Sequence, residues 1–385
     1  MPIPSTIPDP NLPGVFLMSD SFETGGSERQ FAALATSLDR EAFRVFLGCM
    51  TKKGAFLQGL GDVPEFPSGG SVYGWKSLRA RVRMARHMRR NRVSIAHAFD
   101  FYSNLVLIPA ARWARIPVVI GSQRQLGDLL TPKQFKVQLW AFHLCDVVVC
   151  NSRAAADVLV QHGLPERKVA VIGNGLPDTA FTRTASVLPP FPPNTAGLRV
   201  GMVARMNTRS KNHSGLLRAA AQLKNKFPNV QYVLAGDGPV RCELEKEAAD
   251  LGLADRVLFL GDRRDIPAVL SSVDLTVLPS FSESLSNSII ESMALGIPVV
   301  ALRVGGNPEL ISELPGEERG VLVPSGSDEA LAQGLARLLG DEELRRRMGA
   351  NARKFAQATF TVDAMRRRQE ELYMELLRKK GWRPA

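Results

Sequence analysis

The chain has 385 residues, a mass of 42.1 kDa and a formal net charge of +11 at pH 7. Hydrophobic residues make up 45% and charged residues 23%, a composition that excludes a wholly disordered chain and supports one large domain or two. The four cysteines are scattered without a CxxC pair, so neither a disulfide framework nor a zinc finger is expected. There is no apolar run of the roughly 18–20 residues that a membrane span needs, and no secretory signal pattern. We therefore expect a cytoplasmic protein.

Short apolar segments alternate with helix-compatible segments along the chain. In the first half the predicted strands are 14–19, 43–50, 93–97, 117–121, 146–150 and 168–172, with a helix over 28–38. In the second half they are 198–203, 230–235, 256–260, 275–279, 298–303 and 320–323, followed by a helix over 361–380. Continuous apolar strands separated by helices indicate parallel sheets covered on both faces. Each half is therefore predicted to be a doubly wound α/β domain.

A proline-rich segment separates the two halves. Four of the five residues 189–193 are proline, which predicts an extended connector. We accordingly expect an N-terminal domain over 1–188, a linker over 189–197, a C-terminal domain over 198–360 and a terminal helix over 361–385.

The positive charge is concentrated in the first half. From Lys76 to Arg92 there are eight basic residues and no acidic residue. This segment predicts a basic helix with one apolar face, formed by Leu78, Val82, Ala85 and Met88 at helical spacing. Either this face packs on the sheet of an ordinary domain, or the helix binds an anionic membrane surface peripherally; the two can hold together. Aromatic residues are only 7% and do not alternate with the basic residues, so we expect no nucleic-acid partner.

Charged and glycine-rich segments follow several of the predicted strands. Arg205 and Lys211 lie just after strand 198–203, where two cations could bind a diphosphate or could simply be solvated loop charges. A Gly-Asp-Gly turn follows strand 230–235, and Gly25 and Gly26 precede the first helix. Such turns can approach a phosphate closely, or can be plain turns and caps.

The segment 279–300 carries the most specific pattern. Glu283 lies in a polar loop after a strand, and Ser286 or Asn287 can cap the helix that follows. The backbone N–H groups of residues 285–288, at the start of this helix, could bind a phosphate or a sugar hydroxyl. Glu291, one turn further on, could accept hydrogen bonds from a cis-diol such as ribose, or could be a paired structural acid.

This pattern resembles the E-x7-E motif of the retaining glycosyltransferases of family 4, with Glu283 and Glu291 as the two acids. Other segments agree with that family in order and spacing along nearly the whole chain: GGSER (25–29), NS (151–152), IGNG (172–175), VARMNTRSKN (203–212), AGDGP (235–239), MALGIPVVA (293–301) and GGNPE (305–309).

The resemblance implies the GT-B architecture, in which two Rossmann-like domains face each other across a cleft and the terminal helix returns to the first domain. It implies a donor site for a nucleotide sugar in the second domain, with Arg205 and Lys211 on the diphosphate, Glu291 on the ribose and Glu283 facing the sugar. Further donor contacts are expected from Gly25, Gly26, Leu285, Ser286 and Asn287.

The first domain is expected to bind the acceptor. Family members often have two histidines two residues apart after the third strand; here His97 is present, but Phe99 takes the second place. We assign His97 to the catalytic set with Arg205, Lys211 and Glu283; a structural histidine at a strand end is the alternative. Asp100 and Arg124 are candidate acceptor contacts.

These features predict a retaining transferase of hexosyl or N-acetylhexosaminyl groups to a glycan or lipid-phosphate-linked acceptor, in cell-surface polysaccharide or glycolipid synthesis at the inner face of the membrane. The sequence contains no D-x-D triplet, so the two cations would supply the positive charge and no metal or other cofactor is expected. Two alternatives stay open: a nucleotide-sugar epimerase on a similar fold, and a non-catalytic family member that acts as a partner subunit.

Overall fold

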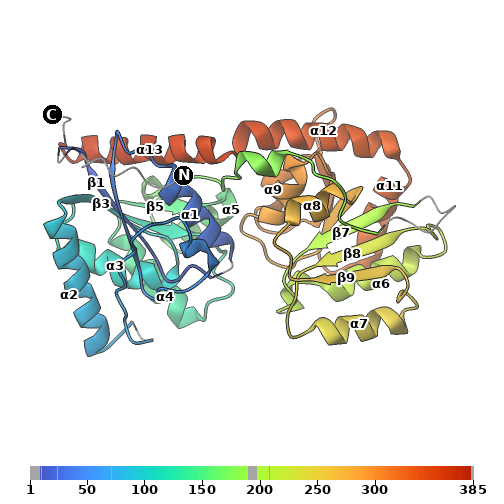
Figure 1. Cartoon of the computed structure of the whole chain (residues 1–385), viewed down its shortest axis with the longest axis horizontal. Helices are drawn as coiled ribbons and strands as arrows, with labels where there is room; N and C mark the ends of the chain where they lie inside the picture. Colours follow the sequence, from blue (N-terminus) through green and yellow to red (C-terminus); the bar gives the residue numbers. More distant parts are fainter. Residues whose placement is uncertain are drawn as a thin grey trace. The chain divides into compact units, whose positions relative to one another are not determined.

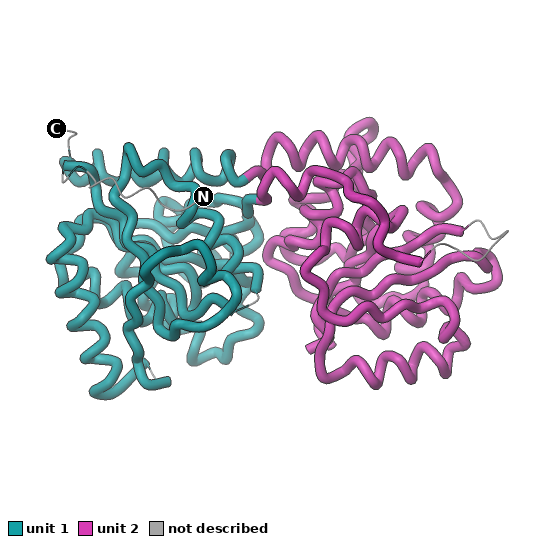
Figure 2. The backbone as a smooth tube through the Cα atoms, in the orientation of Figure 1, with its two compact units in different colours: residues 1–175, 362–385 teal, residues 176–361 magenta. Residues whose placement is uncertain are grey.

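The chain forms two compact units (Figure 2). The computed structural model describes residues 9, 11–23, 25–70, 72–189, 197–207 and 209–382. Unit 1 consists of residues 1–175 and 362–385, and unit 2 of residues 176–361. Most of the predicted linker, residues 190–196, lies outside the described residues.

The first division between the units lies at Gly175–Leu176 rather than at residue 188. Leu176 and Phe181 are buried in the core of unit 2. The Arg183 side chain also donates a hydrogen bond to the Leu295 carbonyl at 2.9 Å. The segment before the proline-rich run therefore belongs to unit 2 through its own packing, which a search for prolines alone does not detect.

Unit 1 is built on a six-stranded parallel sheet (Figure 1). Its strands, in the spatial order β2-β1-β3-β4-β5-β6, are β1 (Gly14–Ser19), β2 (Arg44–Cys49), β3 (Val93–Ala98), β4 (Val118–Gln123), β5 (Val147–Cys150) and β6 (Val169–Val171). The connecting helices are α1 (Gly26–Ser37), α2 (Trp75–Arg90), α3 (Phe101–Trp113), α4 (Pro132–His143) and α5 (Arg153–Gln161). Short 3-10 helices cover η1 (Ala55–Leu57) and η2 (Glu166–Lys168).

Alternate side chains of β1 pack into different cores, which shows that this sheet is buried on both faces. Phe16 and Met18 belong to a core with α2 and α3, whereas Val15 and Leu17 belong to a second core with α1 and the terminal helix. All four side chains are fully buried. Strands with two buried faces read as continuous apolar runs, which is the pattern in the sequence.

Unit 2 has the same type of sheet, in the order β12-β11-β10-β7-β8-β9. Its strands are β7 (Arg199–Val203), β8 (Gln231–Ala235), β9 (Val257–Gly261), β10 (Leu275–Leu278), β11 (Val299–Leu302) and β12 (Gly320–Val323). Its helices are η3 (Asp178–Phe181), η4 (Arg209–Lys211), α6 (His213–Leu223), α7 (Arg241–Asp250), α8 (Ile266–Ser271), α9 (Asn287–Ala294), α10 (Asn307–Leu310), α11 (Asp328–Leu339) and α12 (Glu342–Thr359).

The terminal helix α13 (Val362–Lys379) belongs to unit 1, although α12 before it belongs to unit 2. Tyr373 of α13 is fully buried, and its ring packs edge-on against Phe43. Beyond the helix, Lys380 forms an ion pair with Asp146 at 2.7 Å. Unit 1 therefore contains the last described helix as well as the first described strands.

Helix α2 forms as predicted, but its buried face differs from the predicted one. The residues of α2 that are buried are Ser77, Ala80, Met84, Ala85 and Met88, whereas Leu78 is 42% exposed. The prediction that Leu78 packs with Ala85 and Met88 was therefore wrong. None of the described helices has the length and apolarity needed to cross a membrane.

Candidate functional site

Three loops of unit 2 are joined by backbone hydrogen bonds at the carboxyl edge of its sheet. The Phe281 N–H, after β10, donates to the carbonyl of Ser210, in the loop that follows β7, at 2.9 Å. The Gly306 N–H, after β11, donates to the Glu283 carbonyl at 3.0 Å. Parallel strands end at the same edge of a sheet, which is where open α/β sheets bind ligands.

Lys211 and Glu283 meet across two of these loops. The Lys211 Nζ donates to the Glu283 Oε1 at 2.6 Å. The Lys211 side chain is 30% exposed and the Glu283 side chain is 12% exposed, so most of the surface of this pair is covered by protein. Lys211 was predicted to contact the donor diphosphate and Glu283 to face the sugar, and the structure adds that the two side chains pair directly. Lys211 is thereby held at the site by a carboxylate of the protein itself.

Arg205 lies in the first of these loops and is exposed. Among the residues that the structure describes, Arg205 has no carboxylate within ion-pair distance. The loop is shaped by the turn after β8: a Cβ on Gly236 would lie 2.1 Å from the Ala204 carbonyl oxygen, and one on Gly238 would lie 2.3 Å from the Met206 carbonyl group. Both glycines have positive φ values, 141° and 155°. This Gly-Asp-Gly turn therefore packs on the loop that presents Arg205.

Helix α9 begins beside this pair. The Ser286 hydroxyl caps it by accepting from the Ile289 N–H at 3.3 Å, as the sequence predicted for this residue or Asn287. Leu285 is buried and fixes the entry into the helix. Glu291 lies one turn further along and is 8% exposed. The first N–H groups of a helix have no partner within it, so this end can bind an anion.

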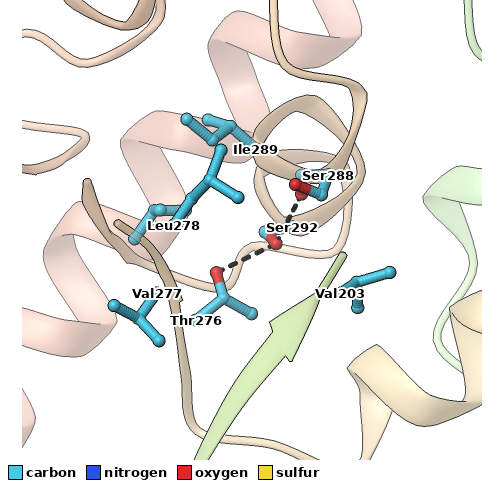
Figure 3. A pocket seen from close by; sticks show the side chains of 8 residues that line it. Val203, Thr276, Val277, Leu278, Ser288, Ile289 and Ser292 are labelled. Atoms are coloured by element: carbon cyan, nitrogen blue, oxygen red, sulfur yellow. Dashed lines mark hydrogen bonds between the residues drawn. The ribbon is translucent and has the colours of Figure 1, made fainter. Parts of the chain in front are cut away.

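A chain of hydroxyl groups attaches α9 to the sheet (Figure 3). The Thr276 hydroxyl of β10 donates to the Ser292 Oγ at 2.9 Å, and the Ser292 hydroxyl donates to the Ser288 carbonyl at 2.8 Å. These groups border a cavity of about 10 Å³, which has room for about one water molecule. The cavity is too small for a substrate, so the hydroxyl chain serves to position α9.

In unit 1, Asp100 joins the ends of two neighbouring strands. It caps α3 by accepting from the Ser103 N–H at 2.9 Å. Its other carboxylate oxygen accepts from the Ser19 hydroxyl at 2.9 Å and from the Asp20 N–H at 2.6 Å. Because both oxygens are occupied, Asp100 has a structural function here in addition to any contact with an acceptor.

His97 is fully buried at the end of β3. Its Nδ1 lies 2.7 Å from the Tyr373 hydroxyl oxygen and its Nε2 lies 2.8 Å from the Ser122 Oγ. Burial, with a smaller effect of nearby Arg124, lowers the pKa of His97 to about 3, so the ring is neutral. Both ring nitrogens of His97 are bonded to side chains of the same unit. In this structure His97 therefore joins the sheet to α13, and its predicted catalytic role stays a prediction.

Arg124 is half-buried at the end of β4. Its Nη2 donates to the Asn174 Oδ1 at 2.6 Å, and its guanidinium carbon lies 5.3 Å from the centre of the Phe99 ring. Burial lowers the pKa of Arg124 to about 10, and the side chain stays charged at neutral pH. Phe99, at the position where the resemblance suggests a second histidine, thus supplies a ring against this cation.

The start of α1 is covered by the side chain of Glu28, which lies in the first turn of the same helix. Gly25 is the N-cap of α1, and a Cβ there would lie 2.0 Å from the Glu28 Oε2. The Glu28 carboxylate therefore lies over the N-cap, while Gly26 opens the helix and is exposed. An anion that approaches Gly25 and Gly26 would have to move this carboxylate.

Asp20 is a candidate that the sequence reasoning missed. It follows β1 at the same edge as Asp100, and burial together with the Asp100 charge raises its pKa to about 6. The available signal was a carboxylate directly after a buried strand, which is the same signal that identified Asp100.

Comparisons with known proteins agree with this architecture. Residues 24–179 match the family model described as Glycosyltransferase Family 4, and residues 191–355 match the model described as Glycosyl transferases group 1. The lipopolysaccharide core biosynthesis glycosyltransferase LpsE of Rhizobium meliloti is 30% identical over 256 residues, which are 66% of this chain and 69% of LpsE. The putative glycosyltransferase EpsF of Bacillus subtilis is 42% identical over 219 residues, 54% of this chain and 56% of EpsF.

Other relatives match over a shorter part. The N-acetyl-alpha-D-glucosaminyl L-malate synthase of Bacillus anthracis is 35% identical over 150 residues, and the match spans 39% of this chain and 39% of that enzyme. Among solved structures, Anabaena HepE in complex with UDP superposes with a TM-score of 0.81 at 23% identity, covering 94% of this chain and 100% of HepE. The two sheets, the two family matches and the LpsE relationship lead to one conclusion: this chain belongs to the GT-B glycosyltransferases.

Proposed function

We propose that this protein is a retaining glycosyltransferase that moves a hexosyl or N-acetylhexosaminyl group from a nucleotide-diphosphate sugar to a glycan or lipid-linked acceptor. The observation that carries the proposal is the Lys211–Glu283 pair beside exposed Arg205 and the start of α9. Relatives that take part in lipopolysaccharide core biosynthesis support an acceptor of cell-surface polysaccharide or glycolipid synthesis.

The donor would bind in unit 2. Arg205 and Lys211 would contact the diphosphate, and the first amides of α9, at Asn287 and Ser288, would add hydrogen bonds to it. Glu291 would accept from the ribose hydroxyls, and Glu283 would face the sugar. HepE was crystallised with UDP and with UDP-glucose, so uracil is the first base to test.

The reaction would exchange one glycosidic bond for another on the same face of the sugar. The bond between the anomeric carbon and the leaving phosphate oxygen breaks, and a bond to the acceptor oxygen forms. The acceptor proton passes to the departing phosphate oxygen. Lys211 and Arg205 would stabilise the negative charge that grows on the leaving diphosphate, the step at which fixed cations contribute most.

The same two cations lead us to propose a metal-independent reaction. Side chains and helix N–H groups would balance the diphosphate charge, so activity should persist in excess EDTA. Loss of activity on chelation, with recovery on addition of Mg²⁺ or Mn²⁺, would contradict this part of the proposal.

Nucleotide binding and transfer can be tested separately. Thermal unfolding should be measured with UDP, GDP and ADP, because a ligand that binds only the folded state stabilises it. The nucleotide that raises Tm identifies the base, and Glu291→Gln should reduce that shift. Turnover with the matching sugars, and the anomeric configuration of the product by NMR, then test retention.

The outcomes distinguish the alternatives. Conversion of the nucleotide sugar to its epimer without an acceptor would support an epimerase. Nucleotide binding without turnover on any acceptor would support a non-catalytic partner subunit. An inverted product would overturn the retaining mechanism.

A further inference from the structure

Helix α2 presents a row of cations on the surface of unit 1. It carries seven Lys and Arg residues and no Asp or Glu. Six of them are exposed: Lys76, Arg79, Arg83, Arg86, Arg89 and Arg90. The opposite side of the helix is anchored by buried Ala80, Met84 and Met88, which pack in the core beneath. The orientation of the charged side is therefore fixed by packing.

The charges on this helix are not neutralised by neighbouring carboxylates. Within the described part of the chain, no cation of α2 forms an ion pair. Arg83 lies over the Phe66 ring, with its guanidinium carbon 5.7 Å from the ring centre. Arg89 donates to the carbonyls of Trp113 and Ala114, at 2.9 Å and 3.3 Å. These contacts orient the side chains and leave their positive charge uncompensated.

Large apolar side chains are exposed to water just before α2 and in its first turn. Trp75 is 77% exposed, Tyr73 is 68% exposed and Leu78 is 42% exposed. Aromatic rings and leucine next to a row of cations are the composition of helices that lie at a membrane–water interface. We call these three residues and the six exposed cations the α2 surface.

The aromatic end of the α2 surface lies at the carboxyl edge of the sheet. Helices that connect parallel strands run opposite to the strands, so their first turns lie where the strands end. A contact agrees with this: the Arg81 Nη2 donates to the Leu105 carbonyl, one turn beyond the Asp100 cap of α3, at 3.2 Å. The end of α2 that carries Trp75 therefore lies at the same edge as Asp100 and Arg124.

We propose that the α2 surface docks unit 1 on a bilayer that contains anionic lipids, with Trp75, Tyr73 and Leu78 among the head groups. The inference rests on the proposed function, because it places the candidate acceptor residues next to the membrane and thereby favours a lipid-phosphate-linked acceptor. A convex helix with aromatic residues at one end suits a planar surface, whereas single-stranded nucleic acid is bound in basic grooves with interleaved aromatic residues.

Charge reversal tests the electrostatic part. Full-length protein should co-sediment with phosphatidylcholine–phosphatidylglycerol vesicles at low salt, and not with phosphatidylcholine alone. About 0.5 M NaCl should release it, because the screening length then falls to about 4 Å. Arg79→Glu/Arg83→Glu/Arg86→Glu should lower vesicle binding at least about 100-fold. The control Arg346→Glu/Arg347→Glu/Lys354→Glu reverses three exposed cations of α12 and should bind normally.

Tryptophan fluorescence tests which residue enters the interface. Vesicles should shift the emission of the wild type to the blue, and Trp75→Phe should remove most of that shift. Trp140→Phe is the matched control, since Trp140 lies on α4 of the same unit and is 59% exposed. A shift that persists in Trp75→Phe and disappears in Trp140→Phe would overturn the assignment of α2.

Measuring UDP binding in the same variants distinguishes a failure of membrane docking from a failure of the proposed donor site. If the wild type binds UDP but does not sediment with anionic vesicles at low salt, the membrane inference falls and the donor proposal stands. Equal binding to neutral vesicles would also overturn it, because charge would then have no part. Binding of single-stranded RNA that competes with vesicles, and is lost in the α2 charge reversal, would instead identify a nucleic-acid surface.

Discussion

At the scale of single residues, the pair formed by Lys211 and Glu283 is the most informative feature. Both follow a strand at the carboxyl edge of one sheet, and their expected roles came from the resemblance to family 4. The sequence could not predict that they bond to each other at 2.6 Å, since their loops are separated by 72 residues in the chain. In the proposed reaction this pairing keeps the ammonium group in place before the donor arrives, which lowers the cost of ordering it in the transition state.

Removal of either donor-site cation tests this role. Arg205→Ala and Lys211→Ala should each lower kcat/KM at least about 30-fold, the equivalent of about 2 kcal/mol of transition-state stabilisation. Lys246→Ala, at an exposed lysine of α7, is the control and should leave turnover unchanged. Near-normal turnover in both donor-site variants would remove the diphosphate assignment.

His97 shows what residue-level prediction from sequence cannot see. A histidine at the end of a strand looks the same in sequence whether it faces a ligand or the core. The deciding contact comes from Tyr373, 276 residues away, which no local pattern reveals. The same limit applies to Glu28, whose position over Gly25 follows from side-chain packing.

The buried state of His97 predicts a pH dependence of stability. Its pKa is lowered from 6.5 to about 3 on folding, so the unfolded chain binds a proton more readily. The contribution of neutral His97 to the free energy of unfolding is fully present above pH 6.5. As the pH falls from 6.5 towards 3, this contribution decreases by up to about 1.4 kcal/mol per pH unit, because the unfolded chain takes up the proton. His97→Gln should make Tm less sensitive to acid between pH 6.5 and 5 than in the wild type. Parallel acid dependence in both proteins would contradict the burial of a neutral ring.

At the scale of elements, continuous apolar runs predicted the strands well. The predicted strand 93–97 corresponds to β3 (Val93–Ala98), and 198–203 to β7 (Arg199–Val203). Runs of apolar residues suffice because both faces of each sheet are buried. The buried face of α2 was less predictable, because two apolar stripes overlap on this helix. Whether Leu78 or Met84 is buried depends on how α2 packs against α3.

Attachment of α9 to the sheet should affect nucleotide binding. Thr276→Val keeps the side-chain shape and removes the hydroxyl that donates to Ser292, so the start of α9 is held less firmly. We expect nucleotide affinity to fall about fivefold, the equivalent of roughly 1 kcal/mol. Thr276→Ser keeps the hydroxyl and is the matched control. Isothermal titration that finds equal affinities for both variants would limit the hydroxyl chain to a role in stability.

At the scale of the whole molecule, the chain passes between its units twice, at residues 175–176 and 361–362. The proline-rich run drew attention to 189–197, but buried apolar residues determine which segment belongs to which unit. Leu176 and Phe181 bury themselves in unit 2, whereas Met365 and Leu377 bury themselves in unit 1. Assigning these segments requires the three-dimensional partners of each apolar side chain, which a single sequence does not supply.

Deletion of α13 should therefore unfold unit 1 and leave unit 2 intact. A chain that ends at Thr361 lacks Tyr373 and Leu377, both fully buried in the core that contains Phe31 and Ile95. Each such side chain contributes roughly 1.5–3 kcal/mol, and a domain is stable by only about 5–15 kcal/mol. Hydrogen exchange should show lost protection in β1 and β3 but retained protection in β7 and β10. A chain that ends at Trp382 keeps α13 and should exchange like the full-length protein. Undiminished protection of β1 and β3 in the shorter chain would show that unit 1 does not depend on the terminal helix.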